Sequence, residues 1–218
     1  EKYNQLNEES ESIKQYFPYD KFRPHQEETI QRIINAISMG KRYILVSAPT
    51  GAGKSSIGYT VANYYAQKES KRTYLLTTEK ILQEQYKSDF FNTGKLDMLM
   101  GKSNYYCGIR KDTKYEDAMC HLIPKIQNVC RSRCPYKLAR ATAKVTKMLL
   151  ANFHYVLADS RLIPEVRLPH PDIIICDEAH NLESILLDQS ILEISEKFVN
   201  YLIETVEVFN NFIKSFDN

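Results

Sequence analysis

The chain has 218 residues, of which 43% are hydrophobic, enough for one large domain with a buried core. Its 29 basic and 27 acidic residues leave a net charge of +2, which neither requires nor excludes nucleic acid as a partner. No run of about 18 apolar residues is present and no secretory signal is visible, so we expect no membrane partner.

Apolar strands and helices are predicted to alternate along much of the chain. An amphipathic helix is expected at residues 23–41 with Gly40 as its stop, because isoleucines recur there at helical spacing. Strands are expected where short runs are almost wholly apolar, and helices where glycine turns or polar residues precede periodic segments. The further elements expected are a strand at 42–49, a helix at 50–67, a strand at 72–78, a helix at 79–91 and a strand at 172–177. Such an alternation predicts an α/β fold with a parallel sheet covered on both faces.

Two segments depart from this alternation. Residues 101–135 show no helical or strand period and are rich in Cys, Lys, Arg and Tyr, so we interpret them as an insertion without a hydrophobic core of its own. Residues 193–218 are predicted to be helical, with one apolar stripe formed by Phe198, Tyr201, Leu202, Thr205, Val208, Phe209 and Phe212. The predicted main lobe therefore comprises residues 1–100 and 136–192.

A glycine-rich loop, "APTGAGKSS" at residues 48–56, joins a predicted strand to a predicted helix. It follows the P-loop pattern except that Ala48 stands in place of the first glycine. Gly51 and Gly53 would let successive backbone N–H groups point toward phosphate oxygens, and the helix adds its positive N-terminal end. We expect Lys54 to reach the β- and γ-phosphates of ATP and Ser55 to bind Mg²⁺; an ordinary glycine turn before a helix is the alternative. The loop residues expected to bind nucleotide are Thr50, Gly51, Ala52, Gly53, Lys54, Ser55 and Ser56.

Two acidic residues follow the last predicted strand. Asp177 and Glu178 would lie at the C-terminal edge of the sheet, where ligands collect in parallel sheets. Asp177 can hold Mg²⁺ through water, and Glu178 can orient or deprotonate the water that attacks ATP. Together with the glycine loop, these acids predict a lobe that binds ATP and Mg²⁺, with Lys54, Asp177 and Glu178 as catalytic residues.

Several motifs resemble those of superfamily 2 helicases. Asp177-Glu178-Ala179-His180 is similar to their DEAH box, which implies a RecA-like lobe and adds His180 to the catalytic set. The segment "TTEKILQEQ" at 77–85 resembles motif Ia, which contacts the nucleic-acid backbone. The segment "FRPHQ" at 22–26 resembles the Q-type motif that reads adenine, which implies that Arg23 and Gln26 bind the nucleotide. For Gln26 the alternative is an exposed residue at the start of a helix.

Four of the five cysteines, Cys107, Cys120, Cys130 and Cys134, fall within 28 residues. Five cysteines do not form a fully paired disulfide set, and the chain is expected to occupy a reducing cytoplasmic or nuclear compartment. Four thiolates suit tetrahedral Zn²⁺ or an iron–sulfur cluster; zinc ribbons usually show two close pairs, and here only the second pair is close. His121, beside Cys120, is a competing ligand.

The segments "CPYKLAR", "LLANFHYVLAD" and "IIICDEAHNLE" resemble the XPD/DinG family of iron–sulfur helicases over residues 22–192. The resemblance implies that Cys107, Cys120, Cys130 and Cys134 hold a [4Fe–4S] cluster, and that the segment after residue 192 begins an arch domain. It also implies an ATP-dependent DNA helicase that unwinds with 5′-to-3′ polarity and needs a second motor lobe. The chain would then be the first lobe, either as a piece of a longer protein or as a short protein that works with another chain.

Nucleic acid is the expected partner, as single-stranded DNA or a DNA fork. Basic side chains around the cysteines could follow the DNA backbone, and tyrosines could either stack on bases or pack internally. The basic residues are Arg110, Lys111, Arg131, Arg133, Lys137 and Arg140, and the tyrosines are Tyr105, Tyr106 and Tyr136. A solvated helix face is the alternative for the basic run after residue 130. A different function is also open, in which the chain binds single-stranded nucleic acid without hydrolysing its nucleotide.

Overall fold

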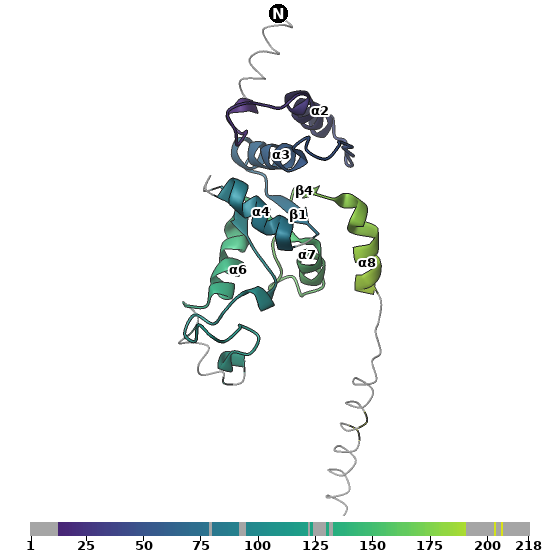
Figure 1. Ribbon diagram of the computed structural model, residues 1–218. Coiled ribbons are helices and arrows are strands. Elements are labelled where there is room, and N and C mark those ends of the chain that lie inside the picture. Colours follow the sequence, from purple (N-terminus) through teal and green to yellow (C-terminus); the bar gives the residue numbers. More distant parts are fainter. Residues whose placement is uncertain are drawn as a thin grey trace, which may run out of the picture. The chain divides into compact units, whose positions relative to one another are not determined.

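A computed structural model of the protein contains a four-stranded parallel sheet with flanking helices (Figure 1). The structure describes residues 13–78, 80–91, 95–121, 123, 130, 133–190, 203 and 206. The chain divides into two compact units, residues 1–182 and residues 183–218. The sheet and all the candidate sites discussed below belong to the first unit, and its RecA-like α/β class agrees with the prediction.

The strands lie in the order β2, β3, β1, β4, and every neighbouring pair is parallel. Their bounds are Asp97–Met98 for β2, Met148–Asn152 for β3, Thr73–Thr77 for β1 and Ile173–Cys176 for β4. All five residues of β1 are buried, which explains why its sequence does not alternate between apolar and charged residues. Parallel pairing places the C-terminal ends of β1 and β4 next to each other, and the Asp177 N–H donates to Leu76 O at 2.9 Å.

Helices pack on this sheet through two clusters of buried side chains. The predicted helices are observed as α2 (Gln26–Ser38), α3 (Lys54–Lys68) and α4 (Lys80–Phe90). Ile30 and Ile34 of α2 pack against Ile57 and Val61 of α3, and Gly40, with φ +76°, lies just beyond the end of α2 as expected. A second cluster joins α3 and α4 to the sheet through Tyr59, Ala62, Leu75, Tyr86, Phe90, Leu96, Met148 and Leu150.

The strand expected at residues 42–49 is not formed, and that prediction was wrong. The segment makes no strand pairing, and Tyr43 and Leu45 are 83% and 91% exposed. No described residue pairs with the outer edge of β4, where Ile174 is half exposed. An apolar β-branched run favours a strand, but a strand also needs a neighbour to hydrogen-bond with, which local pattern does not specify.

Several elements were missed by the sequence patterns, namely β2, β3, α6 (Pro135–Val145) and α7 (Phe153–Ser160). The start of α6 had a signal, since Pro135 occupies its first turn directly after Cys134. Asn152 caps α7 by accepting a hydrogen bond from the Tyr155 N–H at 2.7 Å.

The cysteine-rich segment has little regular structure where it is described, in agreement with its lack of period. It contains the single turns η2 (Lys102–Asn104) and η3 (Met119–His121) and one antiparallel bridge between Tyr106 and Lys114. Compact loops of this kind depend on side-chain contacts rather than on backbone ladders for their conformation.

The first unit ends with the short turn η4 (Ala179–Asn181) and Leu182, and the second unit begins with the remainder of α8 (Leu182–Ser190). The apolar stripe predicted between Phe198 and Phe212 lies outside the described residues. In the part of the chain that the structure describes, no helix has the length and apolar character needed to cross a membrane.

Candidate nucleotide site and cysteine cluster

The glycine loop has the backbone conformation expected of a phosphate-binding loop. Gly51 and Gly53 have φ of +82° and +77°, which residues with a Cβ rarely adopt. Gly53 is also the N-cap of α3, so the helix begins with Lys54, Ser55 and Ser56 at its positive end. The loop therefore presents backbone N–H groups at the place where an anion would bind.

The side chain of Gln26 holds this loop through hydrogen bonds. Its Oε1 accepts from the Arg23 N–H at 2.8 Å, and its Nε2 donates to Ala52 O at 2.9 Å and to Ser56 Oγ at 3.1 Å. A Cβ added to Gly53 would lie 2.2 Å from Gln26 Nε2, so only glycine leaves room for the amide. Gln26 is 2% exposed, which differs from the exposed helix start considered above.

The predicted contact between Gln26 and adenine stays a prediction, because its amide already has partners within the protein. Reading a base would require the amide to exchange some of these hydrogen bonds. Arg23 is likewise engaged, since its Nη1 donates to Gly51 O at 2.6 Å. Both side chains thus contact the loop that would hold the phosphates.

The acidic residues after β4 meet the start of α3. Ser55 Oγ donates to Asp177 Oδ2 at 3.2 Å, and Lys54 Nζ lies 4.0 Å from Glu178 Oε1. Ser55 and Asp177, and likewise Lys54 and Glu178, are 122 or more positions apart in the sequence and come together because α3 begins where β4 ends, at the same edge of the sheet. The hydroxyl and carboxylate are the hard oxygen donors that Mg²⁺ prefers, so the residues present fit a magnesium ion.

Glu178 and His180 complete the acidic edge. Glu178 has φ +53°, a left-handed conformation uncommon for a residue with a side chain and frequent at functional sites. Its Oε2 lies 3.3 Å from His180 Nδ1, and the His180 side chain is 71% exposed. The carboxylate of Glu178 is therefore held between a lysine and a histidine.

The glycine loop, Asp177 and Glu178 line one cavity of about 580 Å³, a volume in the range of small-molecule sites; His180 does not line it. Its walls come from three places: the aromatic segment before α2, the glycine loop with its acidic partners, and the inner side of α4. The lining residues of α4 are Leu82, Gln85, Asp89 and Phe90. Of the residues predicted to bind nucleotide, the cavity includes Arg23, Gln26, Thr50, Gly51, Gly53, Lys54, Ser55, Ser56, Asp177 and Glu178.

Tyr86 was not anticipated from the sequence, although it belongs to the polar set around Asp177. It lies on α4 and donates from Oη to Asp177 Oδ2 at 2.9 Å. Burial, followed by the negative charge of Asp177, raises the pKa of Tyr86 well above its ordinary value, so the hydroxyl keeps its proton. No motif marks a tyrosine at this position.

The four clustered cysteines gather in the folded chain. Cys120 and Cys130 are buried together, and Cys107 packs against them. Burial raises the pKa of the Cys130 thiol, and the nearby Cys120, Cys107 and Cys134 raise it further. Hydrogen bonds from the backbone of Arg110 and Ile109, and one with Cys130, lower the pKa of Cys107. All five cysteines lie in the described part of the chain and none forms a disulfide.

The donor set of four thiols is of the kind that binds zinc or an iron–sulfur cluster. In the described residues, however, no three or more His, Cys, Asp or Glu side chains have the arrangement of metal ligands. The four cysteines therefore have the right ligand type and lie close together, but their side chains do not have the geometry of metal ligands. His121, the alternative ligand, instead bonds through Nε2 to Tyr115 O at 2.8 Å.

Gly108 allows the backbone next to Cys107 to approach the backbone next to Cys134. A Cβ at this position would lie 1.7 Å from Arg133 O, so the chain next to Cys107 touches the chain next to Cys134. Only glycine permits so close an approach between backbones.

Comparison with known proteins assigns the fold to a family. Residues 19–206 match the ResIII family, described as type III restriction enzyme, res subunit. The chain belongs to the ResIII family of superfamily 2 helicases. It is also 31% identical, over 214 residues, to a protein of Methanocaldococcus jannaschii named "Probable ATP-dependent helicase MJ0942". That alignment takes in 84% of this chain and 32% of the relative, so the chain spans about a third of the relative's length.

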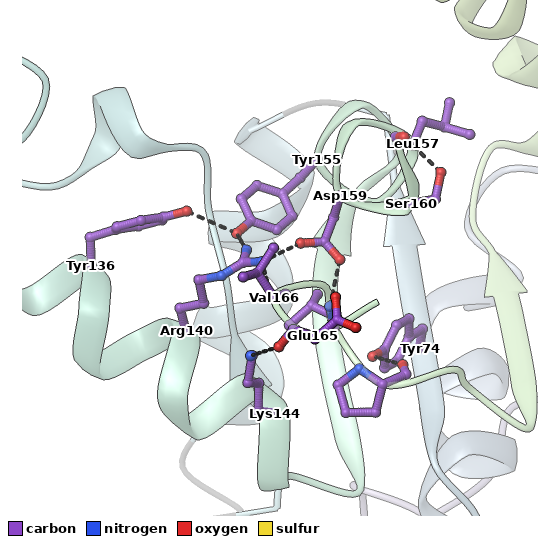
Figure 2. Close-up of polar contacts among 12 residues, drawn as sticks. Tyr74, Tyr136, Arg140, Lys144, Tyr155, Leu157, Asp159, Ser160, Glu165 and Val166 are labelled. Carbon is purple, nitrogen blue, oxygen red and sulfur yellow. Dashed lines mark hydrogen bonds and ion pairs between the residues drawn. The ribbon is translucent and has the colours of Figure 1, made fainter. Parts of the chain in front are cut away.

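Within this ResIII chain, one residue predicted to line a DNA path is structural. Arg140 Nη2 donates to Asp159 Oδ1 and Val166 O at 2.6 and 2.8 Å, and Arg140 Nη1 donates to Tyr155 Oη (Figure 2). The side chains of Arg140 and Asp159 are 18% and 6% exposed. The positive charge of Arg140 is thus neutralised by Asp159 inside the lobe, so Arg140 is unsuited to bind a phosphate.

The tyrosines proposed to stack on bases differ in their surroundings. Tyr136 is buried against Tyr105 and Tyr115, with ring centroids 5.5 and 4.6 Å apart, and Tyr105 also accepts a hydrogen bond from the Met100 N–H at 3.1 Å. These two rings pack internally, which is the second of the two roles considered. Tyr106 is 52% exposed and remains accessible to a base. Among the basic residues, Arg131 lies outside the described part of the chain.

Proposed function

We propose that this chain is the ATP-binding lobe of an ATP-dependent DNA helicase. The observation that carries the proposal is the meeting of Ser55 and Asp177, 3.2 Å apart, in a cavity that also contains Lys54 and Glu178. A strand-end carboxylate and a helix-start hydroxyl at this distance are the arrangement that a magnesium–triphosphate unit requires. Membership of the ResIII family supports the same activity.

Some residues of the site would bind ATP and Mg²⁺, and others would take part in hydrolysis. The glycine loop would hold the phosphates by backbone N–H groups, and Lys54 would bring its charge to the β- and γ-phosphates. Ser55 and Asp177 would hold Mg²⁺, which neutralises charge on the phosphates when bound. Glu178 would orient the attacking water or take its proton, and His180 would hold the Glu178 carboxylate in place.

We propose further that Cys107, Cys120, Cys130 and Cys134 hold a [4Fe–4S] cluster. The packing of Cys107, Cys120 and Cys130 together, with Cys134 near Cys130, supports this. The segment's lack of a large apolar core also supports it, since bound metal can supply the missing folding energy. Zinc is the alternative with the same ligands. Anaerobically prepared protein should be brown and contain iron; colourless protein with one stoichiometric zinc would reverse the assignment.

The substrate we propose is a DNA fork or single strand, engaged near the cysteine-rich segment. Exposed Tyr106 and the basic residues that remain, Arg110, Lys111, Arg133 and Lys137, would contact it. Unwinding also needs a second motor lobe, in the same or another chain, to complete the ATP site. The expected 5′-to-3′ polarity can be measured on duplexes that carry a single-stranded tail at one end or the other.

The test is DNA-stimulated ATP hydrolysis by the longest natural protein that contains this chain. Lys54→Ala should abolish hydrolysis while single-strand binding survives, because the lysine contacts phosphate rather than DNA. Lys68→Ala, also on α3 but outside the cavity, is the control for removing a lysine from that helix. A natural protein that binds single strands but never hydrolyses ATP would instead support the non-hydrolysing binding module.

A further inference from the structure

We infer that Tyr86 is a positioning residue that holds the Asp177 carboxylate ready for a divalent metal, an inference that rests on the proposed nucleotide site. Tyr86 Oη donates to Asp177 Oδ2 at 2.9 Å, shorter than the 3.2 Å bond that Ser55 makes to the same oxygen. The second carboxylate oxygen, Oδ1, accepts from the Glu178 N–H at 3.0 Å. The carboxylate is thus held by three donors from three different parts of the chain.

These contacts leave one direction open at Asp177. A carboxylate offers about four lone-pair sites, and three are occupied by Tyr86, Ser55 and the Glu178 N–H. The remaining site can accept from a metal-bound water or bind the metal itself. Without the Tyr86 hydroxyl, a second site becomes free, and the carboxylate can turn or bind bulk water instead.

Tyr86 is suited to this task because its ring is fixed. It is 2% exposed and packs among the buried side chains that join α4 to the sheet, with its ring edge-on to Phe90 at a centroid distance of 5.5 Å. A side chain locked by packing gives a donor in a constant position, so the orientation of Asp177 is set before the metal arrives. Groups of this kind, which contact a metal ligand rather than the metal, typically alter metal affinity by about 10- to 100-fold.

The experiment measures how nucleotide binding depends on Mg²⁺. A fluorescent, non-hydrolysable ATP analogue is bound to the protein and Mg²⁺ is titrated from zero in the presence of a chelator. For Tyr86→Phe we expect the half-saturating Mg²⁺ concentration to rise by about 10- to 100-fold, while affinity for the analogue without Mg²⁺ changes by less than about twofold. Tyr65→Phe is the matched control, since Tyr65 is 1% exposed and its hydroxyl donates to Ile34 O, away from Asp177.

A double-mutant cycle with Asp177→Asn tests whether Tyr86 acts through Asp177. In the D177N background, Tyr86→Phe should shift the Mg²⁺ dependence little further. An unchanged Mg²⁺ dependence in Tyr86→Phe, or an equal shift in Tyr65→Phe, overturns the inference. If Tyr86→Phe does not fold, Tyr86→Met keeps apolar volume without a hydroxyl and gives the same readout. Wild-type protein that binds no analogue at all would refute the proposed function itself.

Discussion

Breaking the ion pair between Arg140 and Asp159 should destabilise the lobe more than any other single removal of charge on α6. The pair joins α6, which starts directly after Cys134, to the end of α7 and to the loop that leads into β4 (Figure 2). Burial lowers the pKa of Arg140, but the hydrogen bond to Asp159 and the nearby charges of Tyr155, Asp159 and Tyr136 together outweigh it, so the net pKa is raised. The guanidinium therefore stays charged and depends on its partner.

The magnitude follows from the contacts of Asp159. Its Oδ1 accepts from Arg140 Nη2 at 2.6 Å and its Oδ2 accepts from the Leu168 N–H at 2.6 Å. Asp159→Ala loses a charge-assisted bond of about 1.5–3 kcal/mol and leaves a buried N–H unsatisfied at about 1–3 kcal/mol. The expected loss in free energy of unfolding is about 3–5 kcal/mol, the usual cost of removing one member of a buried pair.

Urea unfolding followed by circular dichroism measures this loss. Asp159→Asn should cost less than Asp159→Ala, because the amide oxygen still accepts from the Leu168 N–H. Arg140→Met should lower the free energy of unfolding about as much as Asp159→Ala, since it leaves the buried Asp159 carboxylate without a positively charged partner. Lys137→Met is the control on the same helix, at a partly exposed position, and should change stability by less than about 0.5 kcal/mol.

Two results would refute the reasoning. Losses below about 1 kcal/mol for both single variants would mean that the pair behaves like an exposed ion pair. Additive losses in the double variant Arg140→Met with Asp159→Leu would show that the two side chains do not depend on each other, whereas we expect an apolar pair to recover part of the stability.

The remaining predictions concern the glycine loop, the cysteine cluster and the alkaline limit of stability. Gln26→Ala removes the support of the glycine loop and should weaken binding of an ATP analogue about tenfold in a fluorescence titration, without abolishing folding. Gly108→Ala should push Arg133 away and lower the iron or zinc content of purified protein, whereas wild-type metal content would show that the backbone contact is dispensable. The pKa of Tyr74 is raised by burial to about 12 from 10.0, so its contribution to stability is complete below pH 10 and is lost as pH rises toward 12. Tyr74→Phe removes the hydrogen bond to Pro169 O and should lower the free energy of unfolding, measured with urea, at neutral pH. The same variant should lose less of that free energy than the wild type between pH 10 and 12. An equal loss in both proteins would show that Tyr74 does not cause the alkaline loss of stability.

Local sequence patterns determined most of the main lobe and the chemistry of its site. Periodicity and glycine signals located α2, α3, α4, β1 and β4, because helix faces and buried strands depend on neighbouring residues in the chain. The glycine loop and the acidic pair were recognised for the same reason, since phosphate binding needs glycines and a lysine at fixed local spacing. The short spacing of the cysteines likewise predicted that they lie close together in the folded chain, as Cys107, Cys120 and Cys130 do.

Only the tertiary structure decided how distant residues share their hydrogen bonds. Tyr86 contacts Asp177, Gln26 contacts Ala52, and Arg140 contacts Asp159, each across a distance in sequence that no helical or strand period spans. The same limit explains why residues 42–49 look like a strand but pair with none, and why Arg140 looked like a DNA contact. The residue types in the sequence determine which chemistry is available, whereas side-chain packing determines which donor meets which acceptor.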